Sequence, residues 1–140
     1  DGSSYQGCYL NGKKHGIGLY KWTDGSSYTG DWEENQISGL GIYRWNDGRT
    51  FYGEWLENVM QGYGVYTWPD NRKYEGQYAN DKKQGFGIYT WPDGRVYEGY
   101  WMDGKQHDLG VIRQGKEVKC GLWERGKRLR WFDKEEVEAI

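Results

Sequence analysis

A Gly-x-Gly pattern at residues 85–87 is the feature most able to do chemistry, because paired glycines let a backbone loop approach a phosphate closely. The same pattern recurs at residues 16–18, 39–41 and 62–64, each time 23 residues further along the chain. A phosphate loop occurs once, between a strand and a helix, and no copy here precedes a helical pattern or Gly-Lys-Ser/Thr. We therefore expect structural glycines and no nucleotide cofactor.

Other reactive side chains are scattered along the chain. Cys8 and Cys120 are far apart, which predicts neither a disulfide framework nor a zinc site and favours free thiols in a reducing compartment. His15 and His107 have loop-like neighbours, and no Ser/His/Asp arrangement emerges. We expect no catalytic residues, metal site or cofactor in these residues, so the chain is not predicted to be an enzyme. A catalytic domain elsewhere in a longer protein is the alternative.

The composition indicates an unusual core. The 140 residues include 23 glycines and nine tryptophans, and 18% are aromatic, yet the mean hydropathy is −1.07. Burial must therefore come from Trp and Tyr, which combine large apolar area with a polar atom. The net charge of −2 gives no electrostatic reason to expect a nucleic-acid partner. One segment differs, since residues 113–131 hold seven basic and two acidic side chains.

A 23-residue repeat must position these aromatics. Each unit reads as a strand of the type Tyr-x-Gly-x-Trp, such as residues 28–32, then a polar loop such as residues 33–38. A second strand, Gly-x-Gly-x-Tyr-x-Trp, follows at residues 39–45, and an Asp-Gly turn leads to the next unit. Alternation, aromatics and Asp-Gly turns are typical of hairpins. The sequence predicts an all-β, elongated, twisted, single-layer antiparallel meander.

Period-two alternation assigns the side chains to two faces. Tyr28, Gly30 and Trp32 share a face with the glycines and aromatics of the second strand, so each large ring can lie across a residue without Cβ. The opposite face carries an aliphatic row that includes Ile17 and Leu40. This row is either covered by a neighbour or left as an exposed stripe. Acidic residues expected beside the aromatic groove are Asp31, Glu33, Glu54, Glu57, Glu75 and Glu98.

The repeats are predicted to occupy residues 1–108, beginning near residues 5, 28, 51, 74 and 97. Residues 109–140 are expected to form a degenerate last repeat and a cap, with a final strand at residues 119–123 and a short C-terminal helix from Phe132 to Val137. Asp133 would be the N-cap of that helix, and Glu136 would complete a capping box. Because Asp1-Gly2 matches the repeat's own turn, we expect the chain to be a fragment of a longer protein.

The repeated pattern Y-x-G-x-(W/Y)…G-x-G-x-Y-x-W-x-D-G resembles the MORN (membrane occupation and recognition nexus) repeat over about residues 1–110. The resemblance implies an elongated twisted antiparallel sheet with an aromatic-lined groove. It also implies roles in protein binding, self-association and localisation, with acidic-lipid binding proposed for the family.

The first functional hypothesis is a non-catalytic scaffold or adaptor that binds a peptide or helix of a protein partner through the aromatic groove. Self-association as a homodimer is compatible with it, as are cytoplasmic, cytoskeletal or membrane-proximal assemblies. Large rigid aromatic side chains make efficient anchors for such a partner. The groove residues are Tyr20, Trp22, Tyr28, Trp32, Tyr43, Trp45, Trp55, Tyr66, Trp68, Tyr74, Tyr89, Trp91, Tyr97 and Trp101.

The alternative hypothesis is a membrane-surface targeting module that makes weak contact with anionic phospholipids, since clusters of basic residues can bind their head groups. The net negative charge of the repeats argues against this hypothesis. If it is wrong, the basic side chains are expected to pair with the acidic C-terminal helix as part of the cap. The candidate patch is Arg113, Lys116, Lys119, Arg125, Lys127, Arg128 and Arg130.

Overall fold

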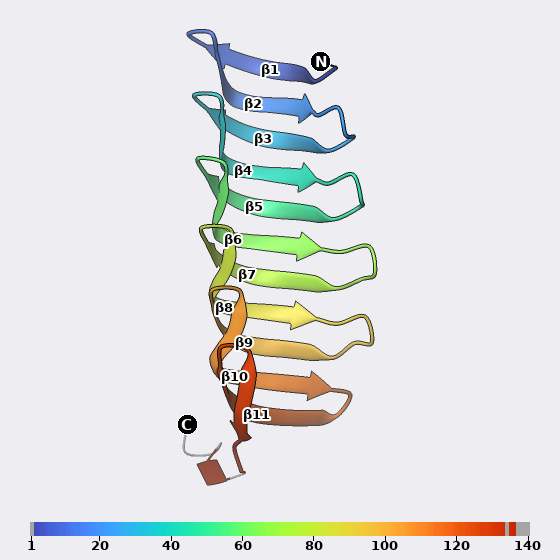
Figure 1. Ribbon diagram of the computed structural model, residues 1–140, viewed down its shortest axis with the longest axis vertical. Helices are drawn as coiled ribbons and strands as arrows, with labels where there is room; N and C mark the ends of the chain where they lie inside the picture. Colours follow the sequence, from blue (N-terminus) through green and yellow to red (C-terminus); the bar gives the residue numbers. More distant parts are fainter. Residues whose placement is uncertain (1, 134, 137–140) are drawn as a thin grey trace.

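The computed structural model describes residues 2–133, 135 and 136, and these form one antiparallel sheet of twelve strands (Figure 1). Each strand pairs with the strands before and after it in the chain, which confirms the predicted all-β meander. The strands are β1 Ser4–Leu10, β2 Lys13–Lys21, β3 Ser27–Glu33, β4 Gln36–Arg44, β5 Thr50–Leu56, β6 Val59–Thr67, β7 Lys73–Ala79, β8 Lys82–Thr90, β9 Val96–Met102, β10 Lys105–Gln114, β11 Glu117–Glu124 and β12 Lys127–Trp131.

The two kinds of connection differ from the expected ones in length. The predicted polar loop at residues 33–38 is a two-residue turn, because β3 ends at Glu33 and β4 begins at Gln36. Its residues Glu34 and Asn35 both have positive φ, 48° and 69°. That pair of conformations is typical of a type I′ hairpin, whose twist matches that of the flanking strands. Strand pairing therefore continues through the segment that was expected to be a loop.

The Asp-Gly segment forms the longer connection. Between β2 and β3, the backbone N–H of Trp22 donates to the carbonyl oxygen of Ser26 (2.9 Å), and Gly25 N–H donates to Trp22 O (3.2 Å). Gly25 has φ of 94°, and Asn71 takes the equivalent position at 75° in a later repeat. Asn tolerates this left-handed conformation better than most residues, so the turn survives without glycine.

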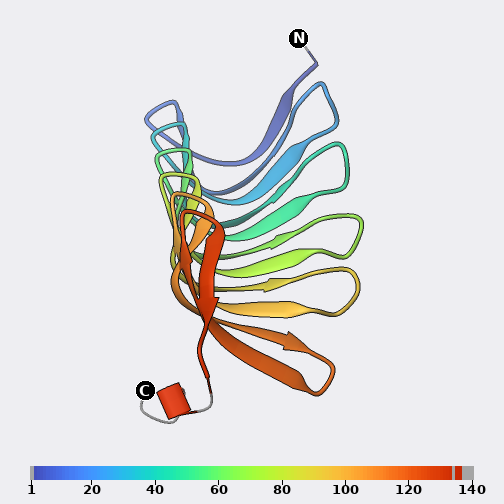
Figure 2. The same cartoon turned by 60° about the horizontal axis from the view of Figure 1, so that its bottom comes forward.

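A bulge bends the odd-numbered strands of the repeats. In β3 the register with β4 shifts between Gly30 and Trp32, and β1, β5 and β7 shift at the equivalent place. The ring centroids of Tyr28 and Trp32 are 5.3 Å apart, whereas an extended strand would separate their Cα atoms by about 13 Å. The Tyr28 ring lies along the strand toward Trp32, with its hydroxyl on Asp31 O (3.0 Å), and the bulge bends the strand around it. Figure 2 shows the bend repeated along the sheet, which becomes a trough.

The register places the core inside this trough. Tyr28 lies opposite Tyr43, and Gly30 lies opposite Gly41, so the aromatics and glycines share one face, which we call the concave face. The opposite, convex face carries Ile17 and the residues in register with it. Among the described residues, the buried hydrophobic side chains all lie on the concave face: Tyr28, Trp32, Ile37, Phe51, Trp55, Tyr66, Tyr74, Tyr78, Tyr97, Trp101 and Trp123.

The C-terminal region continues the sheet. The predicted strand at residues 119–123 is present within β11, and β12, which was not predicted, pairs with it. The predicted capping box is present, since Asp133 N–H donates to Glu136 Oε1 (3.0 Å) and Glu136 N–H donates to Asp133 Oδ1 (2.8 Å). The predicted short helix itself is not seen as an element. Only Glu135 and Glu136 have helical geometry, and residues 134 and 137–140 lie outside the described part.

Candidate functional site

The deepest layer of the trough consists of aromatic rings that the fold uses for itself. The polar atoms of these rings bond to the backbone: the Tyr28 hydroxyl donates to Asp31 O (3.0 Å), and Trp32 Nε1 donates to Gly18 O (3.1 Å). Burial of satisfied rings contributes to stability without leaving a surface for a partner. Six of the expected groove residues are buried in this layer: Tyr28, Trp32, Trp55, Tyr74, Tyr97 and Trp101.

The other eight expected groove residues form a continuous row above that layer, which we call the aromatic ladder. Consecutive rings have centroids 4.3 to 5.8 Å apart, with tilted geometry throughout. Tyr66 is buried, and the other seven side chains are partly exposed. The ladder consists of Tyr20, Trp22, Tyr43, Trp45, Tyr66, Trp68, Tyr89 and Trp91. It is therefore the part of the groove that a partner can reach.

Arginines line the ladder at the same period. The guanidinium groups of Arg49, Arg72 and Arg95 lie 5.0, 4.9 and 4.7 Å from the ring centres of the tryptophans four residues earlier. Arg49 Nη1 also donates to the Tyr66 hydroxyl (2.9 Å), and a hydrogen bond with Tyr89 raises the pKa of Arg72. Each arginine pairs with the aspartate two residues earlier. The accessible part of the groove is thus aromatic and cationic.

A lysine also lies inside the trough. The Nζ atom of Lys83 is 5.4 Å from the ring centre of Tyr74 and 5.5 Å from that of Trp101, with two ladder rings at 5.9 Å. Burial, with a smaller effect of the Arg72 charge, lowers the pKa of Lys83. The equivalent positions of two earlier repeats hold Ile37 and Met60. The interior site thus accepts an apolar side chain or a cation that faces aromatic rings.

The acidic residues do not flank the aromatic groove, so that expectation is wrong. Asp31 lies opposite Ile17, and Glu54 lies opposite Leu40, both on the convex face. Glu75 and Glu98 lie on the same face at a different position of the repeat, opposite Val65 and Ile88. Alternate residues of a strand point to opposite faces, which separates these acids from the rings beside them in sequence. The other two, Glu33 and Glu57, lie at the turn ends of their hairpins.

Half of the predicted aliphatic row on the convex face is exposed. In each of the pairs Ile17/Leu19, Leu40/Ile42, Tyr63/Val65 and Phe86/Ile88 the first member is exposed, from 67% at Ile17 to 44% at Phe86, and the second is partly buried. Asp31 Oδ2 accepts a hydrogen bond from the backbone N–H of Leu40 (2.9 Å), so acids and apolar residues alternate on this face. Leu109, which was not predicted as part of the row, continues its exposed members in the last repeat, at 37%.

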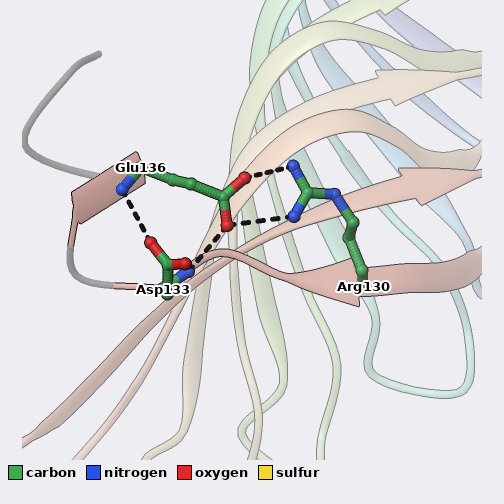
Figure 3. A network of polar contacts seen from close by, with 3 residues as sticks. All are labelled: Arg130, Asp133 and Glu136. Carbon is green, nitrogen blue, oxygen red and sulfur yellow. Dashed lines mark hydrogen bonds and ion pairs between the residues drawn. The ribbon is translucent and has the colours of Figure 1, made fainter.

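The seven basic residues of the candidate lipid patch are divided between both faces and the turns. Arg113 pairs with Glu98 on the convex face (Nε–Oε1 2.9 Å). Arg130 forms a two-pronged ion pair with Glu136 (Figure 3), with Nη1 at 3.0 Å from Oε1. The structure therefore does not bring the seven together on one face. Lys119 and Arg128 lie on the concave face against Trp131, while Lys116, Arg125 and Lys127 are exposed at or beside turns.

Five further aromatics line the trough but are not among the expected groove residues: Tyr5, Phe51, Tyr78, Trp123 and Trp131. The repeat itself could have identified three of them, because Tyr5 and Phe51 lie 23 residues before and after Tyr28, and Tyr78 precedes Trp101 by the same interval. Trp123 packs edge-on against Tyr97, with centroids 5.1 Å apart. No sequence pattern indicates Trp131, because it belongs to β12, which was not predicted.

Other candidate chemistry receives no structural support among residues 2–133, 135 and 136. No group of three or more His, Cys, Asp or Glu side chains in this part could hold a metal ion. Cys8 is exposed and Cys120 is partly buried, and both are free thiols, as predicted. None of the described helices is long and apolar enough to cross a membrane.

Comparison with known proteins identifies the repeat. The family model described as MORN repeat matches five segments, residues 5–27, 28–48, 51–71, 74–94 and 97–113. A search of curated proteins finds no match. The family match covers most of the chain, including every residue of the aromatic ladder.

Proposed function

This chain belongs to the MORN repeat family, and from that premise we propose that it is a non-catalytic module that binds a peptide or helix of a protein partner along the aromatic ladder. The observation that carries the proposal is the continuous row of partly exposed rings in the trough, from Tyr20 to Trp91. It offers a partner a series of rigid anchors in a preformed concavity. Such anchors cost little conformational entropy on binding.

The ladder is suited to binding because the fold does not need its exposed edges. The deep rings are buried and hydrogen-bonded, and they hold the bend. The ladder rings contact one another, yet Trp45 and Trp68 keep part of their surface in solvent. A partner that covers this surface removes apolar area from water, and Arg49 and Arg72 beside it attract acceptor groups.

Anionic-lipid binding has less support. A lipid surface binds basic residues that share one face, whereas Arg113 and Arg130 are paired on the convex face and Lys119 and Arg128 lie on the concave face. The convex face also carries Asp31 and other acids. We therefore keep membrane contact as an outcome of the test.

The test is a pull-down from a cytoplasmic extract with three forms of the chain. The ladder variant is Trp45→Ala with Trp68→Ala, and the matched control is Leu40→Ala with Phe86→Ala on the convex face. Circular dichroism and a thermal melt establish that each is folded. We expect a retained partner to be lost with the ladder variant and kept with the control. Equal retention by both variants contradicts the proposal.

A parallel flotation on anionic vesicles at physiological salt tests the alternative. Flotation that disappears when the basic residues of 113–130 are neutralised would replace the ladder proposal with membrane targeting. A retained protein that proves to be a second copy of this chain would identify self-association as the function of the ladder.

A further inference from the structure

The ladder ends at Trp91, and a pocket opens where its next two rings are missing. The positions 23 residues after Tyr89 and Trp91 hold Ile112 and Gln114. Both side chains line a pocket of ≈ 330 Å³ at the C-terminal end of the concave face. The indoles of Trp91, Trp123 and Trp131 form part of its wall. The pocket therefore has aromatic sides and lacks the two rings that fill this place in earlier repeats.

Arg95 at this pocket lacks a tyrosine hydroxyl of the kind that Arg49 bonds to. Arg49 donates to the Tyr66 hydroxyl (2.9 Å), and interaction with Tyr89 raises the pKa of Arg72; each tyrosine is a ladder residue 17 positions ahead of its arginine. For Arg95 the equivalent residue is Ile112, which has no hydroxyl. Within the described residues, Arg95 keeps its ion pair with Asp93 (3.2 Å) and its contact with the Trp91 ring. Its remaining N–H groups have no protein acceptor there.

The opposite wall is also cationic. Arg128 lies 4.5 Å from the ring centre of Trp131, and Lys119 Nζ lies 5.4 Å from it. Together with Arg95, which also pairs with Asp93, they give the pocket lining three positive side chains and one carboxylate, that of Glu117. The charge selects acidic occupants, and the indole walls select a ring.

We propose that this pocket binds a tyrosine side chain carried by an acidic segment of a protein partner. The tyrosine ring takes the place of the missing ladder rings, and its hydroxyl oxygen accepts from Arg95 as that of Tyr66 accepts from Arg49. Carboxylates beside the tyrosine pair with Lys119 and Arg128. The inference rests on the proposed function in that the occupant belongs to a protein partner, and it adds the chemistry of one contact.

The probe is a fluorescein-labelled peptide of sequence Asp-Glu-Tyr-Glu-Asp, titrated with the full chain and followed by anisotropy. The central variant is Ile112→Tyr with Gln114→Trp, which restores the repeat pattern and fills the pocket with the chain's own rings. We expect peptide affinity to fall at least tenfold. Arg95→Gln, which leaves the pocket open, is expected to weaken binding severalfold and keeps the test decisive if the filled variant does not fold. Replacing the peptide's tyrosine with alanine is expected to abolish binding.

The ladder variant Trp45→Ala with Trp68→Ala separates this inference from the proposed function, because it leaves the pocket intact. We expect it to bind the peptide as the natural chain does. No binding of the peptide to the natural chain, or unchanged binding by both pocket variants, overturns the inference while leaving the ladder proposal to its own pull-down. Partner loss in that pull-down without peptide loss here supports two distinct contacts.

Discussion

Phe51 occupies the space that a side chain on Gly64 would need. A Cβ atom built on Gly64 would overlap Cζ and Cε1 of the Phe51 ring. The same relationship links Tyr28 with Gly41, Tyr74 with Gly87 and Tyr97 with Gly110. A single-layer sheet has no second layer to cover its aromatic rings. Each ring is instead buried flat against the neighbouring strand, which is possible only where that strand carries glycine. Rings and glycines are therefore repeated together.

Gly64→Ala should destabilise the fold by about 3 kcal/mol, because the added methyl group overpacks the Phe51 site. Gly94→Ala is the matched control. A Cβ there meets nothing within 4 Å, but φ is 92°, so that variant reports only the conformational cost of about 1 kcal/mol. Guanidinium denaturation measures both. Gly64 has no positive φ, so a loss no larger than that of Gly94→Ala would show that overlap with the Phe51 ring is not what excludes a side chain there.

Lys83→Met should raise the free energy of unfolding at pH 7 by about 1 kcal/mol. Met60 shows that the site accepts this side chain, and the change removes a charge that burial disfavours. Because burial lowers the pKa of Lys83, the unfolded chain binds that proton more tightly. The natural protein therefore carries the cost of burying the charged Lys83 amine at neutral pH, and this cost disappears as pH rises toward 10.5 and the amine loses its proton.

Denaturation of both forms at pH 7 and 9.5 checks this expectation, and the gain from Lys83→Met should shrink at the higher pH. Lys82→Met is the control, since Lys82 is the exposed neighbour on β8. A Lys83→Met protein less stable than the natural one would show that attraction between the cation and the rings exceeds the desolvation cost.

The protein should lose stability above pH 10. Burial raises the pKa of Tyr28, Tyr74, Tyr78 and Tyr97 well above 10.0. The unfolded chain loses these protons near pH 10, whereas the folded chain keeps them. The stability that the four protonated hydroxyl groups contribute is therefore fully present below pH 10 and declines as pH rises. At pH 11 each of these tyrosines lowers the free energy of unfolding by about 1.4 kcal/mol. Absorbance at 295 nm should show these tyrosines ionising only on unfolding.

Tyr74→Phe supplies the control for the alkaline effect, because Phe51 already occupies the equivalent position. Between pH 8 and 11 this variant should lose less unfolding free energy than the natural chain, by one tyrosine's share. An identical loss in both proteins would assign the alkaline transition to other groups.

The Glu136 carboxyl should titrate with a pKa of about 2, because the Arg130 guanidinium and the backbone N–H of Asp133 stabilise its charged form. The folded pKa lies below the usual 4.5, so this contact supports the C-terminal turn above pH 4.5 and is lost as pH falls toward 2. Carbon-detected NMR titration measures it directly. Arg130→Gln should raise the pKa toward 4.5, whereas Arg128→Gln should leave it in place.

Much of this architecture was readable from local patterns. Alternation within residues 28–32 and 39–45 predicted which side chains share a face, and the family resemblance agreed. Turn geometry was harder, because the segment at residues 33–38 is polar like a loop, yet Glu34 and Asn35 both adopt positive φ and close a two-residue turn. The prediction for the acids is wrong because Asp31, although next to Trp32 in sequence, points to the opposite face of the strand.

By itself, the sequence determined the meander, the two faces and the pairing of rings with glycines, because a 23-residue period and an alternation of two act within neighbouring strands. Only the tertiary structure decided how deep each ring lies. The bend at Gly30 buries Tyr28 and Trp32 and leaves Trp45 partly open, and that curvature results from contacts summed over several strands. The C-terminal pocket is likewise tertiary, because it exists only where β12 brings Trp131 against Trp123 beside the gap at Ile112.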